Sequence, residues 1–178
     1  MNLFKSASFT AGILCGLLVC IVIFKIANQD HRARTAYDER QKEIRGRGYR
    51  AGFYAFMLYE LLFTIFGFCG ISVPLEMYQI HLLALVFGGM VLTCYCIWHD
   101  AYWGLNNDRR RYYAVFAFLL VLNLLPVVLH AVKGELFEDG VLNSLFPNLL
   151  VSGMMIVLGG VLLARHFVGR RLEAEEEE

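Results

Sequence analysis

Five long apolar runs, separated by polar and charged segments, dominate this sequence. They cover residues 9–27, 51–70, 79–98, 112–130 and 146–167. About 20 apolar residues in an α-helix, at about 1.5 Å per residue, are needed to cross roughly 30 Å of hydrocarbon. Each run meets this requirement. The pattern therefore predicts an all-α protein, a single-domain bundle of five transmembrane helices over residues 1–178.

The polar segments between the runs are short, except for an arm at residues 28–50. Within the arm, Asp38 can cap a short helix, and Gln41 stands where the partner of a capping box would be. Gly46 and Gly48 are expected to end this short helix before the second apolar run begins. The acidic tail, residues 172–178, is low in complexity and is expected to be disordered.

The distribution of positive charge orients the predicted bundle. The chain has 16 Lys and Arg, and fourteen of them lie in three alternate gaps: Lys25 with residues 32–50, residues 109–111, and residues 165–171. Lys and Arg concentrate in cytoplasmic loops of membrane proteins. The predicted topology is therefore N-out and C-in, with the arm cytoplasmic. The formal net charge of +0 conceals this asymmetry, and a hydrophobic content of 58% argues against a soluble domain.

One acidic residue, Glu60, lies well inside an apolar run, about ten residues from either end. A charged side chain near the bilayer centre costs about 2.5–3.5 kcal/mol on insertion scales, so such residues usually face a bundle interior or a cavity. Thr64 and Gly67 follow on the same helical face and form a small, polar stripe. Together with similar residues on other runs, Glu60 defines a candidate buried polar layer: Glu60, Asn123, Ser152, His81 and His130.

Two interpretations of this layer stay open. In the first, polar groups from His81 and His130 inward to Glu60 form a proton or cation relay. In the second, a protonated Glu60 hydrogen-bonds Asn123 or Ser152 and fixes the packing of the helices, through bonds of about 0.6–2 kcal/mol. The residues between Glu60 and the cytoplasmic end are mostly apolar. This favours the second interpretation, because a relay needs polar groups that continue to the other surface.

Glycine pairs offer notches for close helix packing. Gly12 and Gly16 form a GxxxG pattern on the first run, and residues 88–89 and 159–160 are Gly-Gly. Such small residues let helix backbones approach each other. Packing within one chain is favoured over dimerisation, so a homo-oligomer is compatible with the sequence but not indicated by it.

The sequence has no recognisable hydrolase, zinc-protease or nucleotide-binding signature. Cys94, Cys96 and His99 would make a poor metal site, because the two cysteines point to different sides of a helix. We therefore expect a protein that is not an enzyme and that uses no cofactor or catalytic metal.

Two sequence boxes lie at predicted cytoplasmic helix ends. The first is YDERQ at residues 37–41, followed by IRGRGY at 44–49 and GFY at 52–54; the second is YCIW at 95–98, followed by DAY at 100–102 and LN at 105–106. In this order the boxes resemble a family of small uncharacterised membrane proteins of anaerobic Gram-positive bacteria, sometimes grouped as a domain of unknown function. The similarity extends from Tyr37 to the last helix. It implies a bacterial plasma-membrane protein and brings no established activity or ligand.

The expected function is that of a non-enzymatic accessory, sensor or immunity-type component, acting through a partner at its cytoplasmic face. The candidate contact surface is drawn from the two boxes and consists of Asp38, Glu39, Arg40, Gln41, Arg45, Arg47, Trp98, Asp100, Tyr102 and Asn106. The alternative is a small transporter or channel subunit with a buried polar site around Glu60. The expected partners are the lipid bilayer and a second membrane or cytoplasmic protein, and no nucleic acid.

Overall fold

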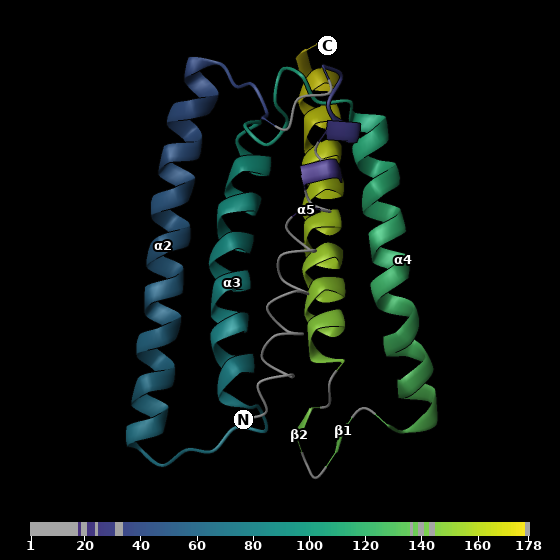
Figure 1. The fold of residues 1–178 in the computed structure, drawn as a ribbon. Coiled ribbons are helices and arrows are strands. Elements are labelled where there is room, and N and C mark those ends of the chain that lie inside the picture. Colours follow the sequence, from purple (N-terminus) through teal and green to yellow (C-terminus); the bar gives the residue numbers. More distant parts are fainter. Residues whose placement is uncertain are drawn as a thin grey trace. The chain divides into compact units, whose positions relative to one another are not determined.

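The computed structural model describes residues 18, 21–23, 25–30, 34–135, 137–138, 141–142 and 145–176. Within them, four long helices follow one another along the chain, with two short strands before the last helix (Figure 1). The helices are α2 (Glu39–Phe68), α3 (Met77–Trp98), α4 (Arg109–Lys133) and α5 (Phe146–Glu176). The antiparallel strands are β1 (Phe137–Glu138) and β2 (Val141–Leu142). The all-α class is confirmed, with the strand pair a minor addition.

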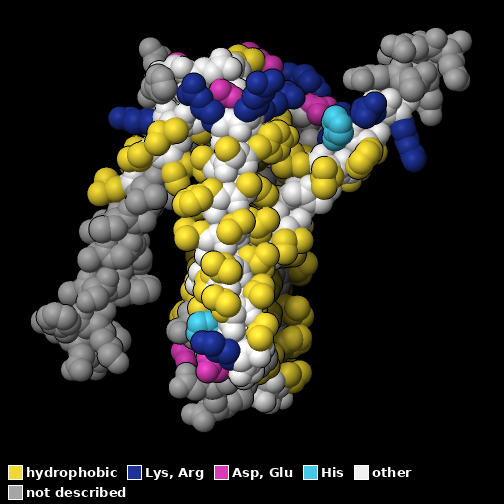
Figure 2. Space-filling model, turned by 90° about the vertical axis from the view of Figure 1, so that its right-hand side faces the viewer, with side chains coloured by type: hydrophobic (Ala, Val, Ile, Leu, Met, Phe, Trp, Pro, Cys, Tyr) yellow, Lys and Arg dark blue, Asp and Glu magenta, His cyan; other side chains and the backbone are white. Residues whose placement is uncertain are grey.

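All four helices are long and apolar enough to cross a membrane. Figure 2 shows hydrophobic side chains along the helix surfaces, as expected where the surroundings are lipid rather than water. Each helix contains most or all of one predicted apolar run. The first predicted run, residues 9–27, lies largely outside the described residues, as do Gly12 and Gly16. Within that run, residues 21–23 and 25–27 are helical.

The chain divides into two compact units. We call Met1–Asp38 with Trp103–Ala117 the clasp unit, and Glu39–Tyr102 with Phe118–Glu178 the bundle unit. Helix α4 begins in the clasp unit and continues in the bundle unit. The expectation of a single membrane domain stays a prediction, and each unit is described by itself.

Helix α2 is continuous from Glu39 to Phe68. The prediction that Gly46 and Gly48 end a short helix is therefore wrong, although the helix does begin directly after Asp38. A glycine in a helix interior costs about 1 kcal/mol relative to alanine. At Gly48 the surroundings explain why glycine is present, because an added Cβ would lie 3.0 Å from Leu92 Cδ1 on α3. This glycine thus serves helix packing rather than helix termination.

Helices α2 and α3 come into close contact at two glycines. An added Cβ at Gly52 would lie 2.6 Å from the carbonyl oxygen of Gly88, and one at Gly88 would lie 2.9 Å from that of Gly52. The two backbones are therefore in direct contact, which only small residues permit. The prediction of a packing notch at Gly88 is confirmed, whereas an added Cβ at Gly89 or Gly160 has no neighbour within 4 Å.

Helix α3 lies between α2 and α5 and packs against both (Figure 1). Its first turn is fixed by Gln79, whose Oε1 accepts a hydrogen bond from the Glu76 backbone N–H at 2.9 Å. This is one half of a capping box, and it satisfies a donor at the helix start. In α5, Pro147 occupies the first turn, where its missing N–H removes no helix bond.

Candidate functional site

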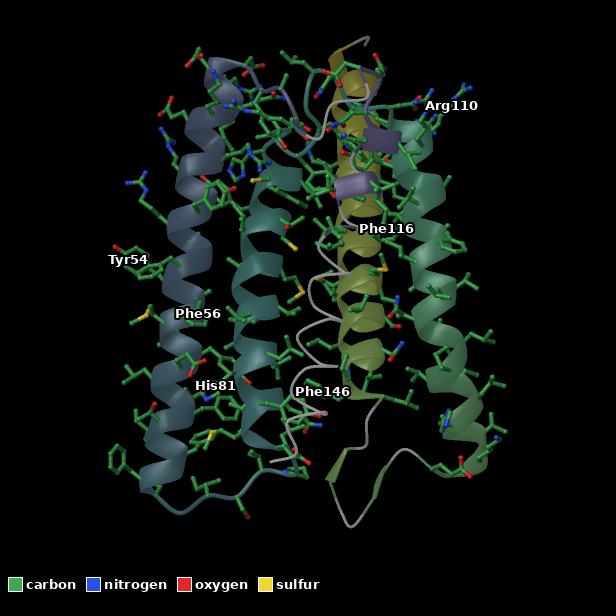
Figure 3. The ribbon with its side chains drawn as sticks, in the orientation of Figure 1. Tyr54, Phe56, His81, Arg110, Phe116 and Phe146 are labelled. Atoms are coloured by element: carbon green, nitrogen blue, oxygen red, sulfur yellow. The ribbon has the colours of Figure 1, made fainter. Side chains whose placement is uncertain are left out.

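Glu60 and His81 meet across the interface of α2 and α3. His81 Nδ1 lies 3.0 Å from Glu60 Oε1 and 3.2 Å from Oε2. The imidazole lies between the two helices (Figure 3). The Glu60 side chain is 25% exposed and that of His81 is 56% exposed. Thr64 shares this region of α2, and its hydroxyl donates to the Glu60 carbonyl at 2.8 Å.

His81 lies near the start of α3, whereas Glu60 lies between the middle and the end of α2. Glu60 precedes the end of α2 at Phe68 by eight residues, and His81 follows the start of α3 at Met77 by four. At about 1.5 Å per residue, these positions are about 12 Å and about 6 Å from the helix ends. The sequence-based estimate placed Glu60 at the middle of its helix because it used residues 51–70 alone. That range leaves out the N-terminal turns of α2, which begins at Glu39.

A second polar contact joins α4 and α5 within the bundle unit. Asn148 Nδ2 donates to Asn123 Oδ1 at 3.3 Å, and Asn123 Nδ2 donates to the carbonyl of Leu119, one turn earlier, at 2.8 Å. Asn148 is not among the candidates from the sequence, although it lies one turn before Ser152. The spacing of four residues between Asn148 and Ser152 could have identified it, because residues four apart lie on the same face of a helix.

The other two members of the predicted layer have no cross-helix bond among the described residues. His130 Nδ1 donates to the carbonyl of Pro126 in its own helix at 2.9 Å. Ser152 is buried, and its hydroxyl has no hydrogen-bond partner in the described part of the chain. Of the five predicted residues, Glu60 pairs with His81 rather than with Asn123 or Ser152, and Asn123 contacts Asn148, which is outside the predicted layer. His130 and Ser152 stay separate from these two pairs.

In the clasp unit, Asn106 binds the segment that precedes α2. Its Oδ1 accepts the backbone N–H of Ala36 at 2.8 Å. Its Nδ2 lies 3.1 Å from both carboxylate oxygens of Asp30 and 3.1 Å from the carbonyl of Arg34, and donates to them. One side chain thus satisfies groups that are distant in sequence. Asn106, chosen as a contact-surface residue, holds the chain together at this point.

Asn28 and Asn107 form the second part of this structure, and with Asn106 we call them the asparagine clasp. Asn28 is fully buried, and its Oδ1 accepts from Asn107 Nδ2 at 2.7 Å and from the Tyr112 hydroxyl at 3.1 Å. An isolated backbone bridge also joins Asn28 to Asn107. Gly104 lies so close that an added Cβ would be 2.6 Å from the carbonyl oxygen of Ala36. Apart from Asn106, sequence analysis missed all of these residues.

In the bundle unit, the residues after α3 are held by two arginines. Arg165 Nη2 of α5 donates to Asp100 Oδ2 at 2.5 Å, and Arg45 Nη1 of α2 donates to the Ala101 carbonyl at 3.4 Å. Asp100 has a positive φ of 57°, a left-handed conformation that Asp tolerates better than most residues. The turn at Asp100 is therefore fixed by side chains from both neighbouring helices.

The rest of the predicted contact surface is mostly exposed. Glu39 pairs with Lys42 at 2.6 Å, and Arg47 pairs with Glu43 at 2.6 Å, each within α2. Trp98 is 50% exposed at the end of α3. Of the others, Asp38 and Arg40 are exposed, Tyr102 is half-buried and Gln41 is buried.

These sites offer an acid–imidazole pair, an amide pair and a hydrogen-bonded loop. Within the described residues there is no group of three or more His, Cys, Asp or Glu side chains that could hold a metal ion. No protein-family model matches the chain, and no curated protein or solved structure matches it.

Proposed function

We propose that this chain is a five-span integral membrane protein of a bacterial plasma membrane, oriented N-out and C-in, that acts non-enzymatically through a partner at its cytoplasmic face. Four helices long and apolar enough to span support this proposal, together with the concentration of Lys and Arg in alternate gaps. The resemblance of the two boxes to a family of small bacterial membrane proteins supports the location. The role is that of an accessory, sensor or immunity-type component.

The observation that carries the proposal is how the side chains of the second box are placed. Its polar residues hold the loop after α3 in place: Asp100 pairs with Arg165, and Asn106 binds Asp30 and Ala36. Its large apolar residues stay exposed, with Trp98 50% and Leu105 66% accessible. In each unit the box thus presents an exposed apolar side chain beside polar contacts that hold the segment. Trp98 in particular has the composition of a contact residue, because Trp, Tyr and Arg are enriched among the residues that supply most of the binding energy at interfaces.

Site-specific photo-crosslinking in native membranes tests the partner role. A photoreactive amino acid at Trp98 or Leu105 should give a discrete adduct with a second protein. The matched control is Tyr54, which is 68% exposed on α2 but lies within the apolar run. Adducts that are equal at Tyr54 and at the two box positions, or that form only with lipid, would contradict the proposal.

Cysteine accessibility tests the orientation. In a variant that lacks the native cysteines, Cys at Arg110 should be protected from a membrane-impermeant maleimide in intact cells, whereas Cys at Lys133 should react. Arg110 and Lys133 lie near opposite ends of α4, so they report on the two faces independently. The opposite labelling pattern would reverse the proposed orientation.

A small transporter or channel subunit centred on Glu60 remains the alternative. The pairing of Glu60 with His81 favours it, whereas the division of the polar candidates into separate contacts favours the partner role. Proton or ion flux through the purified protein in vesicles, abolished by Glu60→Gln with folding intact, would establish the alternative.

A further inference from the structure

Three arginines and three aromatic rings lie together where α4 begins, all within the clasp unit. Residues 109–111 are consecutive arginines, and each is exposed. The Trp103 ring meets the rings of Tyr112 and Tyr113 edge-on, with centroids 5.7 Å and 5.4 Å apart. The Arg109 guanidinium carbon lies 5.8 Å from the centroid of the Trp103 ring. We call the following residues the arginine–aromatic patch: Trp103, Arg109, Arg110 and Tyr113.

The asparagine clasp holds the ring on which this patch is built. The Tyr112 hydroxyl donates to Oδ1 of the buried Asn28 at 3.1 Å. Asn107 Nδ2 in turn donates to the Tyr112 hydroxyl oxygen at 3.3 Å. Tyr112 thus gives the Trp103 ring a fixed surface to pack on. A surface fixed in this way loses less conformational freedom on binding than a mobile one, which favours affinity.

Only one of the three arginines pairs with a carboxylate among the described residues. Asp108 Oδ2 pairs with Arg111 Nε at 3.1 Å, and Asp108 Oδ1 accepts the backbone N–H of Arg110 at 3.0 Å. Arg111 also donates to the Ile26 carbonyl at 3.2 Å. The guanidinium groups of Arg109 and Arg110 have no carboxylate partner in the described part of the chain. With three arginines and one aspartate, residues 108–111 carry two positive charges in excess.

These charges do not serve the stability of α4. Its first turn contains no acidic residue, and basic residues are unfavourable there because the N-terminal end of a helix already carries partial positive charge. Near the start of α2, by contrast, Lys42 pairs with Glu39 and Arg47 pairs with Glu43. The positive charges of Arg109 and Arg110 are therefore available to an anion from outside the chain.

The place of the patch along α4 indicates which anion it meets. The apolar run begins at Tyr112, directly after the arginines. Trp and Tyr concentrate where the hydrocarbon of a membrane meets the lipid headgroups. The Arg110 side chain extends away from this end of α4 (Figure 3). Arginine binds phosphate through two N–H groups at once, and basic clusters beside a membrane span attract anionic lipids.

We propose that the arginine–aromatic patch binds the headgroup of an anionic phospholipid. Arg109 and Arg110 bind the phosphate, and the rings of Trp103 and Tyr113 contact the upper part of the acyl chains. This inference rests on the proposed placement of α4 across the membrane but not on the partner role. Maleimide labelling at the two ends of α4 tests that placement separately. A chain whose α4 crosses the membrane, yet which shows no preference for anionic lipid, would overturn this inference alone.

Native mass spectrometry of the full-length wild type tests the proposal without any variant. The detergent-purified protein is titrated with phosphatidylglycerol and with phosphatidylcholine of the same acyl chains. Phosphatidylglycerol should stay bound at concentrations at which phosphatidylcholine does not. Excess inorganic phosphate at constant ionic strength should not displace it, because the acyl chains contribute to binding. Equal binding of the two lipids, or displacement by inorganic phosphate, would overturn the proposal.

Charge variants locate the site. Arg110→Gln should weaken the binding of phosphatidylglycerol about fivefold, and the double variant with Arg109→Gln roughly twenty-fivefold. The matched control is Arg47→Gln, which removes the same charge from an arginine paired with Glu43 and should leave the affinity nearly unchanged. An equal loss in Arg47→Gln and Arg110→Gln would show attraction to net charge alone and would overturn the proposal.

The role of the rings is tested at constant charge. Trp103→Leu should weaken the binding of phosphatidylglycerol severalfold, because Arg109 loses the ring that it lies over. The matched control is Trp98→Leu, which removes a half-exposed tryptophan outside the patch and should have no effect. Hydrogen exchange of the Asp108 amide, which donates to Ala27 O at 3.2 Å, checks that the clasp unit stays folded. Unchanged binding in Trp103→Leu, or an equal loss in both variants, would overturn the role given to the rings.

Discussion

Helices α2 and α3 are joined where two glycine backbones touch, whereas the asparagine clasp joins distant segments through side-chain amides. In lipid, water does not compete for hydrogen bonds and apolar surfaces gain little from mutual burial, so close packing of small residues holds helices together. At the chain's polar loops, backbone N–H and C=O groups need partners, and asparagine supplies both a donor and an acceptor. The comparison predicts that the α2–α3 contact is sensitive to an increase in side-chain volume at the glycines. The asparagine clasp should instead be sensitive to the loss of hydrogen-bond donors and acceptors.

The largest effect is expected for Gly52→Leu. The new Cβ would lie 2.6 Å from the Gly88 carbonyl oxygen, which belongs to the backbone and cannot move alone. We expect a loss of about 3 kcal/mol in the free energy of unfolding, the upper end for overpacking. Denaturation in mixed micelles measures it. Gly46→Leu is the matched control, since a Cβ there has no neighbour within 4 Å; an equal loss in both variants would refute the packing role.

Gly104→Ala should cost about 2 kcal/mol in the clasp unit, because the new Cβ overlaps Thr35 and the carbonyl of Ala36. Faster hydrogen exchange of the Leu105 amide, which donates to Ala36 O at 2.8 Å, is the specific readout. Gly153→Ala, with nothing within 4 Å of the added Cβ, should leave that amide unchanged. Equal exchange in both variants would mean that the loop does not depend on a glycine.

Asn106→Leu preserves side-chain size and removes the amide, so it isolates hydrogen bonding. The Ala36 N–H loses its acceptor, and Asp30 and the Arg34 carbonyl lose a donor. Since these groups are partly accessible to water, we expect a loss of about 1–2 kcal/mol. Asn106→Asp restores only the acceptor. It should recover the protection of the Ala36 amide from hydrogen exchange, but it should not restore the hydrogen bond to Asp30. If Asn106→Leu were as stable as the wild type, the hydrogen bonds of Asn106 would add nothing to stability and the clasp would depend on packing alone.

Glu60 and His81 should contribute less to stability than either contact above. A double-mutant cycle with Glu60→Gln and His81→Gln should give a coupling energy of about 0.6 kcal/mol and at most about 1.7 kcal/mol, the mean and the maximum measured for polar pairs in membrane helices. Each single variant should still express and fold. A coupling energy near zero would mean that the 3.0 Å contact adds nothing to folding.

The smallest effect is expected for Arg47→Gln. Its partner Glu43 lies one turn away on the same helix, and both side chains are mostly exposed. Such pairs contribute less than about 0.5 kcal/mol and are screened by salt. A larger loss that persists at high salt would indicate that Arg47 contacts another molecule, and would place it on the partner surface.

Most of the helices could be predicted because their signal is local. The run at 79–98 and the helix Met77–Trp98 nearly coincide, since apolar length fixes both. The start of α2 was harder, because Gly46 and Gly48 are ordinary helix breakers in isolation. At Gly48 the close packing on α3 explains why glycine is present within a continuous helix, whereas an added Cβ at Gly46 has no neighbour within 4 Å. Local propensity was overruled there by a tertiary contact.

The sites could be predicted only in part, for the same reason. Helical periodicity found Glu60 and His81 but not that they face each other, because one sequence does not tell which helices are neighbours. The clasp was missed because Asn28 and Asn107 are 79 positions apart, and two asparagines in separate loops resemble ordinary turn residues. The box at residues 105–106 drew attention to this loop without revealing what it binds.

The continuity of α2 also has a mechanical consequence. Thirty residues at about 1.5 Å each make a rod of about 45 Å, longer than roughly 30 Å of hydrocarbon. If one end of the rod tilts, the other end must swing, because the helix runs without a break from Glu39 to Phe68. A displacement of α2 near Glu60 would therefore also displace the charged N-terminal turns of the helix, which begin at Glu39.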